Sequence, residues 1–164
     1  MQLQVTTFWA LLLLGATSTT SAADCGNLDQ NIVIRSHKSG LVLVADEVLN
    51  IITLQVYDRS VSQRFHFQPG VTLASFNIIS NSTGLALDII ENGSLYVATL
   101  TELNDLKSQE FYINSDGAIV SGAYPDYALG VRNGDFTPGS YIVLTPHTEE
   151  NIESEQFSLE FSQS

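Results

Sequence analysis

The chain has 164 residues, and its 18 acidic side chains against six basic ones give a formal net charge of −12 at pH 7. This charge argues against nucleic acids and anionic lipid surfaces as partners, because both are themselves negatively charged. The single cysteine, Cys25, has no second cysteine to pair with inside the chain, which excludes a small fold held together by internal disulfides.

The N-terminal segment has the pattern of a secretory signal peptide. The apolar run FWALLLLGA at 8–16 is too short to span a bilayer, and small residues follow it. We expect cleavage after Ala22, so that residues 1–22 are the signal peptide and 23–164 form one secreted, extracellular domain. A membrane anchor is the alternative, and the lack of a charged stop-transfer flank disfavours it. The rest of the chain predicts no membrane span.

Two N-glycosylation sequons agree with an extracellular location. They are NST, which begins at Asn81, and NGS, which begins at Asn92. The sequence therefore predicts a secreted glycoprotein with glycans at these two asparagines.

A short motif recurs at a fixed interval along the chain. It reads SQRFHF from Ser62, SQEFYI from Ser108 and SEQFSL from Ser154, so successive copies lie 46 residues apart. Upstream of each copy, an apolar strand, a turn and a second strand are expected, followed by a third strand. The first pairs of strands span 31–45, 75–89 and 118–131, and the third strands span 52–58, 95–101 and 140–146. The turns HKSG, NSTG and AYPD carry residues that tight turns favour.

The recurring motif itself is expected to be a fourth strand. Phe65 and Phe67 alternate with polar residues, and so do Phe157, Leu159 and Phe161, which indicates a strand with one buried face. Helical periodicity is absent. Four strands in each of three copies (about 30–70, 71–116 and 117–164) predict an all-β fold, a β-trefoil of twelve strands. A propeller normally needs at least four blades, and a sandwich would not explain the threefold spacing.

The chain resembles the ricin B-type β-trefoil lectin family, which carries a Gln-x-Trp motif in each of three repeats. Gln63-Arg64-Phe65 and Gln109-Glu110-Phe111 are similar to that motif with Phe in place of Trp, and the third copy has Glu155-Gln156-Phe157. The segments FYINSDGAIVS (111–121) and PGSYIVLTP (138–146) are also similar to family segments. The resemblance spans essentially the whole mature chain and implies a carbohydrate-binding protein.

In this family the sugar is held by an Asp at the end of the second strand, an aromatic residue just after the third strand and an Asn before the motif. In the first copy Val44 takes the Asp position, with Asp46 two residues on, and Tyr57 matches the aromatic residue. In the second copy Asp88 matches, Thr101 takes the aromatic position, and Tyr96 and Asn104 lie nearby in sequence.

The third copy matches the sugar-binding pattern at none of the three positions. Gly130, Thr145 and Ser154 stand there, and the nearby polar residues are Arg132, Asn133, Asp135 and His147. No copy is therefore complete, and the resemblance implies partly degenerate sugar sites with Asp88, Tyr96, Asn104, Asp46 and Tyr57 as candidate ligand residues.

The sequence shows no catalytic constellation. The three histidines lack the spacing of metal ligands, and there is no nucleophile elbow and no phosphate-binding loop. We therefore expect no enzyme, no metal and no cofactor. Carbohydrate or glycoprotein glycans are the expected partners. The alternative is a secreted protease inhibitor or protein-binding effector, in which the loops RSHKSG (35–40) and YDRSVS (57–62) present basic residues to a protease.

Overall fold

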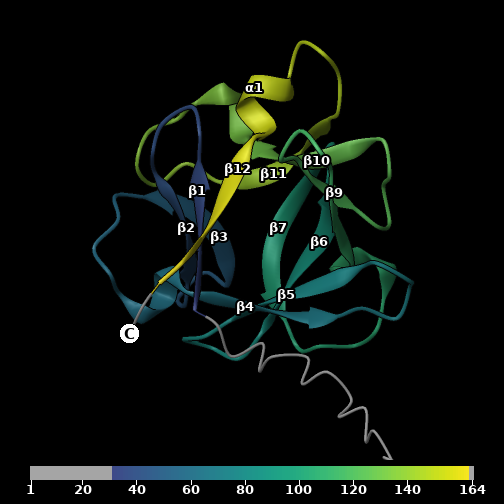
Figure 1. Ribbon diagram of the computed structural model, residues 1–164, viewed down its shortest axis with the longest axis horizontal. Coiled ribbons are helices and arrows are strands. Elements are labelled where there is room, and N and C mark those ends of the chain that lie inside the picture. The colour runs from purple at the N-terminus through teal and green to yellow at the C-terminus, as the bar shows by residue number, and fades with distance from the viewer. Residues whose placement is uncertain (1–30, 163–164) are drawn as a thin grey trace, which may run out of the picture.

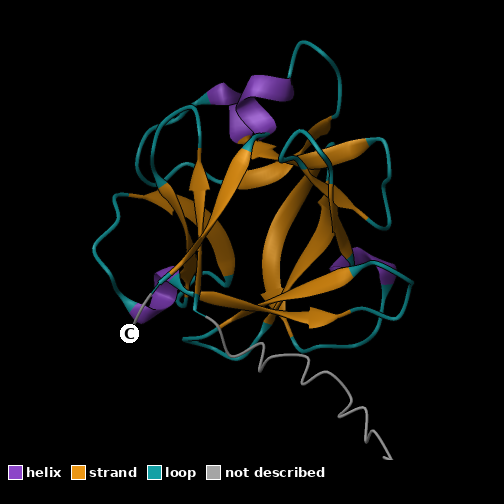
Figure 2. Ribbon diagram, viewed as in Figure 1, coloured by secondary structure: helices purple, strands orange, loops and turns teal. Residues whose placement is uncertain are grey.

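The computed structural model describes residues 31–162, so the predicted signal peptide and Cys25 lie outside the described residues. The expected all-β class is confirmed, since strands dominate and the helices are single turns (Figure 1, Figure 2). The first copy contains β1 (Ile32–Ser36), β2 (Val42–Asp46), β3 (Ile51–Gln55) and β4 (Phe65–Pro69). The second contains β5 (Phe76–Ser80), β6 (Ala86–Asn92), β7 (Leu95–Thr101) and β8 (Phe111–Ile113). The third contains β9 (Ile119–Ser121), β10 (Tyr127–Val131), β11 (Ile142–Pro146) and β12 (Phe157–Phe161).

Each fourth strand is preceded by a short helical turn. These turns are η1 (Val61–Gln63), η2 (Lys107–Gln109) and α1 (Ile152–Glu155), and a further turn, η3 (Arg132–Gly134), follows β10. Among the described residues, no helix is long and apolar enough to cross a membrane.

Antiparallel pairing joins the copies into one closed sheet. The fourth strand of one copy pairs with the first strand of the next in β4–β5 and β8–β9, and β12 returns to pair with β1 along its whole length. The two ends of the described chain meet there, where the Ser162 N–H donates to the Asn31 carbonyl over 2.7 Å. A second ring of contacts joins the hairpins through Ile51↔Thr99 and Val143↔Val97. Closure leaves few free strand edges.

The same position of each copy fills the shared core. Phe65 and Phe111 are completely buried and Phe157 nearly so, and Leu43, Leu87 and Leu129 lie with them in one hydrophobic cluster. Burying an aromatic or branched side chain contributes about 1.5–3 kcal/mol relative to leaving it exposed. The alternation read from the sequence thus identifies the inward face of these strands.

A buried amide holds the irregular segment between the third and fourth strands in the first two copies. The Gln63 Oε1 accepts from the Asp58 and Arg59 N–H groups over 2.9 and 3.2 Å, and its Nε2 donates to the Val56 carbonyl over 2.8 Å. The Gln109 amide does the same with the Asn104 N–H and the Glu102 carbonyl over 2.9 and 2.8 Å. The motif recurs because each loop needs this internal partner for its backbone.

The third copy places a carboxylate where the other two have an amide. Glu155 is completely buried, and its Oε1 accepts from the Thr145 hydroxyl over 2.6 Å while its Oε2 lies 2.6 Å from His147 Nδ1. His147 Nε2 lies 3.3 Å from the Asp116 carboxylate. Gly130 makes room for this arrangement, because a Cβ there would lie 2.4 Å from the Thr145 hydroxyl oxygen.

Glu110, inside the second motif, fastens the connection between the first and second copies. Its carboxylate accepts from the Thr72 N–H over 2.8 Å and from the Thr72 hydroxyl over 2.6 Å. Only 2% of Glu110 is exposed. The hydrogen bond from the Thr72 side chain lowers the pKa of Glu110 below its usual 4.5, against the opposing effect of burial.

We expect Gln109→Ala to lower the free energy of unfolding by about 2–3 kcal/mol, because it leaves backbone groups without a partner inside the protein. Gln156→Ala is the matched control, since the Gln156 side chain is partly exposed and forms no hydrogen bond with other residues of 31–162. Urea unfolding measures both, and equal effects of the two substitutions would contradict the role of the buried amide.

We expect Glu110→Gln to weaken the acid sensitivity of the protein. A carboxylate whose pKa is lowered by folding stabilises the folded state above its unfolded pKa, and this contribution is lost as the pH falls through the folded pKa. The difference in unfolding free energy between wild type and Glu110→Gln should therefore shrink when urea unfolding is compared at pH 6 and pH 3. A difference that stays constant with pH would contradict this.

Candidate functional site

The hairpin between β10 and β11 differs from its two counterparts in length. Residues 132–141 connect these strands, whereas 47–50 and 93–94 connect the corresponding strands of the first and second copies. The longer loop begins with η3 and passes through the left-handed region at Asn133 (φ 56°) and Gly139 (φ 93°). The extra chain gives the third copy a surface feature that the other two hairpins lack.

The loop is held against the first copy at several points. The Gly139 N–H donates to the Leu54 carbonyl over 2.7 Å, and the Leu54 N–H donates to the Ser140 carbonyl over 2.9 Å. The Lys38 ammonium lies 5.1 Å from the centre of the Phe136 ring, which is within the range of a cation–π contact. The backbone of the loop is thus positioned by β3.

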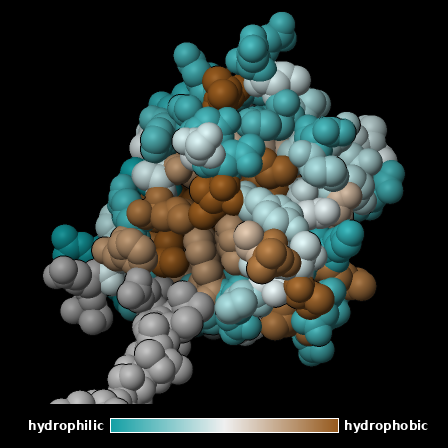
Figure 3. Space-filling view, turned by 45° about the vertical axis from the view of Figure 1, so that its right-hand side comes forward, coloured by the Kyte–Doolittle hydropathy of each residue, from teal (hydrophilic) through white to brown (hydrophobic). Residues whose placement is uncertain are grey.

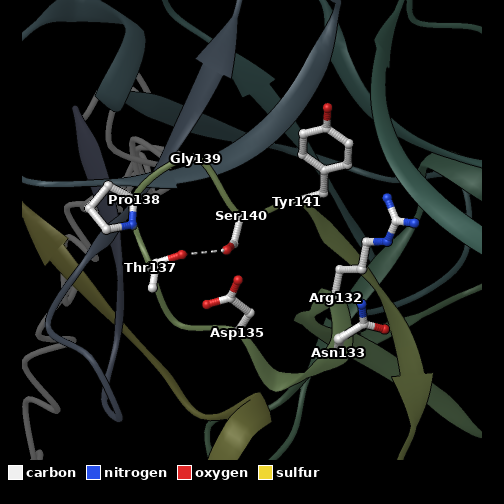
Figure 4. Close-up of a pocket in the computed structure, with 8 residues that line it drawn as sticks. All are labelled: Arg132, Asn133, Asp135, Thr137, Pro138, Gly139, Ser140 and Tyr141. Carbon is white, nitrogen blue, oxygen red and sulfur yellow. Dashed lines mark hydrogen bonds between the residues drawn. The ribbon is translucent and has the colours of Figure 1, made fainter.

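A shallow cleft of about 460 Å³ lies inside this loop (Figure 4). Its lining combines one carboxylate, one guanidinium, one amide, two aliphatic hydroxyls and one phenol ring, from Asp135, Arg132, Asn133, Thr137, Ser140 and Tyr141. Figure 4 shows the Asp135 carboxylate directed toward the Ser140 side of the cleft and the Tyr141 ring standing at its edge. This composition offers hydrogen-bond donors, acceptors and an apolar ring face within one small volume.

The charged groups of the cleft are available to a ligand. Within residues 31–162, Asp135 accepts no hydrogen bond at its carboxylate, and Arg132 has no carboxylate within 4.0 Å. The Arg132 guanidinium lies 5.8 Å from the centre of the Tyr141 ring. The Thr137 and Ser140 hydroxyls are 3.3 Å apart and exposed. A neutral polyhydroxylated ligand could accept from Arg132 and donate to Asp135.

The sequence did not single out these residues as ligand contacts. Arg132, Asn133 and Asp135 depart from the family pattern, and Tyr141 lies on the strand side of the loop. The sequence feature that could have indicated this loop is its length, because the gap between the second and third predicted strands is longest in the third copy. The turn residues NG and PG inside this gap also indicate a folded loop.

The candidate ligand residue Asp88 lies inside the second copy. It is 6% exposed, and its Oδ2 accepts from the Thr101 hydroxyl over 2.7 Å and from Gln109 Nε2 over 3.2 Å. Its Oδ1 is buried and has no hydrogen-bond partner in the described part of the chain. A sugar would have to reach this enclosed oxygen, so a sugar contact at Asp88 stays a prediction.

The other two candidates in the second copy differ in their relation to Asp88, since the Asn104 N–H donates to the Gln109 amide that contacts Asp88, whereas Tyr96 lies farther along the strand pair. Tyr96 lies near the hairpin end of β7, and its ring packs on Tyr124 and Tyr127 of the third copy with centroids 4.3 and 5.6 Å apart. Burial raises the pKa of the Tyr96 hydroxyl, with a smaller effect from Glu91. Asn104 is exposed, and its Oδ1 accepts from the Leu106 N–H over 3.1 Å.

The candidates in the first copy lie at opposite ends of β3. The Asp46 Oδ1 caps the hairpin turn by accepting from the Val48 and Leu49 N–H groups over 3.0 and 2.9 Å. Tyr57 follows β3 and lies beneath the Arg35 guanidinium, 5.3 Å from its carbon. The structure therefore does not bring the two candidates of this copy together.

The two loops considered for protease binding differ in whether their arginine is ion-paired or exposed. Arg35 forms a two-point contact with Glu160 over 2.7 and 2.9 Å, which raises the pKa of Arg35 and lowers that of Glu160. Arg59 is exposed in a left-handed conformation (φ 68°). No contact here favours a protease partner, which stays a prediction.

The two sequon asparagines have different surroundings. Asn81 is partly buried, and its Nδ2 donates to Asn31 Oδ1 over 2.7 Å while its Oδ1 lies 2.7 Å from His66 Nδ1. Asn92 is exposed at the β6–β7 turn. A glycan is more readily accommodated at Asn92.

Comparisons with known proteins identify the fold. No family model and no curated protein matches the chain. Among solved structures, a Macrolepiota procera ricin B-like lectin in complex with lactose aligns with a TM-score of 0.68 at 19% identity, covering 84% of this chain and 99% of that one. An earthworm R-type lectin C-half in complex with GalNAc aligns with a TM-score of 0.64 at 14% identity, covering 81% and 99%. A designed threefold symmetric protein, ThreeFoil, aligns with a TM-score of 0.67 at 15% identity, covering 79% and 96%.

These similarities confirm the expected resemblance at the level of the fold. At identities of 14–19% they carry over neither ligand nor site. The chain has the ricin B-type β-trefoil fold.

Proposed function

We propose that the protein is a secreted, non-catalytic carbohydrate-binding β-trefoil whose ligand binds in the cleft of loop 132–141. The observation that carries this proposal is the grouping of Asp135, Ser140 and Tyr141 in one cleft, with the Asp135 carboxylate unengaged by residues 31–162. A carboxylate that accepts from vicinal hydroxyls, next to an aromatic face for the C–H side of the ring, is a suitable arrangement for a sugar.

We also infer that the fold consists of three equivalent four-strand units, the β-trefoil arrangement expected from the sequence. The matching positions of Gln63, Gln109 and Glu155, each ahead of a buried phenylalanine, support this inference. Secretion belongs to the same proposal.

The lectin structures with similar folds support the choice of ligand class. Their complexes with lactose and GalNAc show sugars bound by those proteins. In this chain the family positions are degenerate and Asp88 is occupied internally, so the proposal assigns binding to a loop that those positions do not include.

Asp135→Ala should reduce glycan affinity about 10- to 100-fold, because a hydrogen bond to a charged group contributes about 1.5–3 kcal/mol. A glycan array of the mature protein would identify a ligand, and isothermal titration calorimetry would measure the change. Asp126→Ala is the matched control, since Asp126 is an exposed aspartate of the same copy outside the cleft.

Asp88→Asn separates the two candidate locations. If this substitution abolishes binding while Asp135→Ala does not, the ligand binds in the second copy and the proposed site is wrong. If the array shows no binding to any glycan, carbohydrate binding itself is contradicted.

A further inference from the structure

A second cavity, of about 470 Å³, opens where the three β-hairpins meet. The β3–β7 and β7–β11 pairings and the Thr53↔Tyr141 bridge bring the hairpins together. Each copy contributes apolar side chains to its walls, which are Leu49, Ile51, Leu95, Val97 and Val143. The fold thus builds one cavity from side chains that are far apart in the sequence, and we name it the apolar cavity after its five aliphatic side chains.

The aliphatic side chains of this cavity suit an apolar group. Among the residues that the structure describes, no carboxylate lines the cavity, and Asn92, Arg132 and Tyr141 give it a polar side next to the aliphatic one. Leu49 is 57% exposed at its edge, so an occupant would remove apolar surface from water. Removing such surface from water is favourable in proportion to its area.

The two cavities adjoin one another. Arg132 and Tyr141 line both the polar cleft of loop 132–141 and the apolar cavity. In Figure 4 both side chains extend from the cleft on the side away from Asp135. Their volumes are similar, about 460 and 470 Å³, and both fall in the range of small-molecule sites. A ligand with a polar part and an apolar part of comparable size would fill both.

We propose that the ligand is a neutral glycoside with an apolar aglycone, held with its sugar in the polar cleft and its aglycone in the apolar cavity. This inference rests on the proposed carbohydrate function and specifies the class of carbohydrate. An acidic sugar is disfavoured, because Asp135 lies in the cleft and the chain carries a net charge of −12. Arg132 then acts as a hydrogen-bond donor at the junction of the two parts.

The test compares matched pairs of ligands that differ only in the aglycone. Methyl and n-octyl β-galactosides, β-glucosides, N-acetyl-β-glucosaminides and α-mannosides are titrated below micelle-forming concentrations into the mature chain. The protein is produced without N-glycans, because Asn92 lines the apolar cavity. At least one n-octyl glycoside should bind tenfold or more tightly than its methyl partner, since each buried methylene strengthens binding about fourfold.

Two variants locate the gain in affinity. Leu49→Ser combined with Leu95→Ser should bring the n-octyl glycoside close to the affinity of the methyl glycoside, without changing the latter. Leu73→Ser is the matched control, because Leu73 is 93% exposed and does not line either cavity. Thermal unfolding verifies that all variants are folded.

The remaining outcomes distinguish the inference from the proposed function. Equal affinity for methyl and n-octyl glycosides, lost in Asp135→Ala, overturns the two-part ligand and leaves carbohydrate binding in place. Binding of n-octyl glycosides that is insensitive to both the sugar and Asp135→Ala overturns the inference, because the apolar cavity then acts alone. Failure of every glycoside to bind overturns both.

Discussion

The fold depends on a buried polar side chain ahead of each closing strand, and in the first two copies this is an amide that fixes the backbone of the preceding loop. Gln63 and Gln109 each satisfy backbone donors and acceptors that no strand can reach, which allows the following phenylalanine to enter the common core. An unpaired backbone group at such a depth would cost free energy comparable to a lost hydrogen bond. In these two copies one polar side chain therefore fixes the loop ahead of the apolar residues that follow it.

The same amide also contacts the one carboxylate that matches the family's sugar-binding pattern. In the second copy Gln109 also donates to Asp88, and Thr101 donates to the same oxygen, so the carboxylate is incorporated into the network that holds the loop. In the third copy Gly130 replaces the carboxylate, and the buried Glu155 interacts with Thr145 and His147. Polar groups that could face a ligand stabilise the fold instead.

Most of the fold could be predicted from the sequence, and the candidate site could not. Apolar and polar residues alternate around Phe65 and Phe157, and the pattern recurs at a 46-residue spacing. This alternation predicts the buried face of a strand, because side-chain direction alternates with a period of two along any strand. The cleft depends on where loop 132–141 folds back, and this is decided by pairing with Leu54, about 85 residues away along the chain. The orientation of Asp88 is likewise decided by partners on other elements, so its burial could not be read from its own strand.

Hairpins of unequal length make the surface of this fold asymmetric. If all three connections were as short as 93–94, the apolar cavity at their meeting point would be surrounded by equivalent turns. The longer loop 132–141 breaks this equivalence by placing Arg132 and Tyr141 on one side of the cavity and a polar cleft beyond them. Because loop 132–141 is tied to β3 and contributes only the partly buried Phe136 to the packing against the core, it can differ in length from the other two without disturbing the closed sheet. The length of this one connection is therefore sufficient to form the polar cleft beside the cavity without a change in the core.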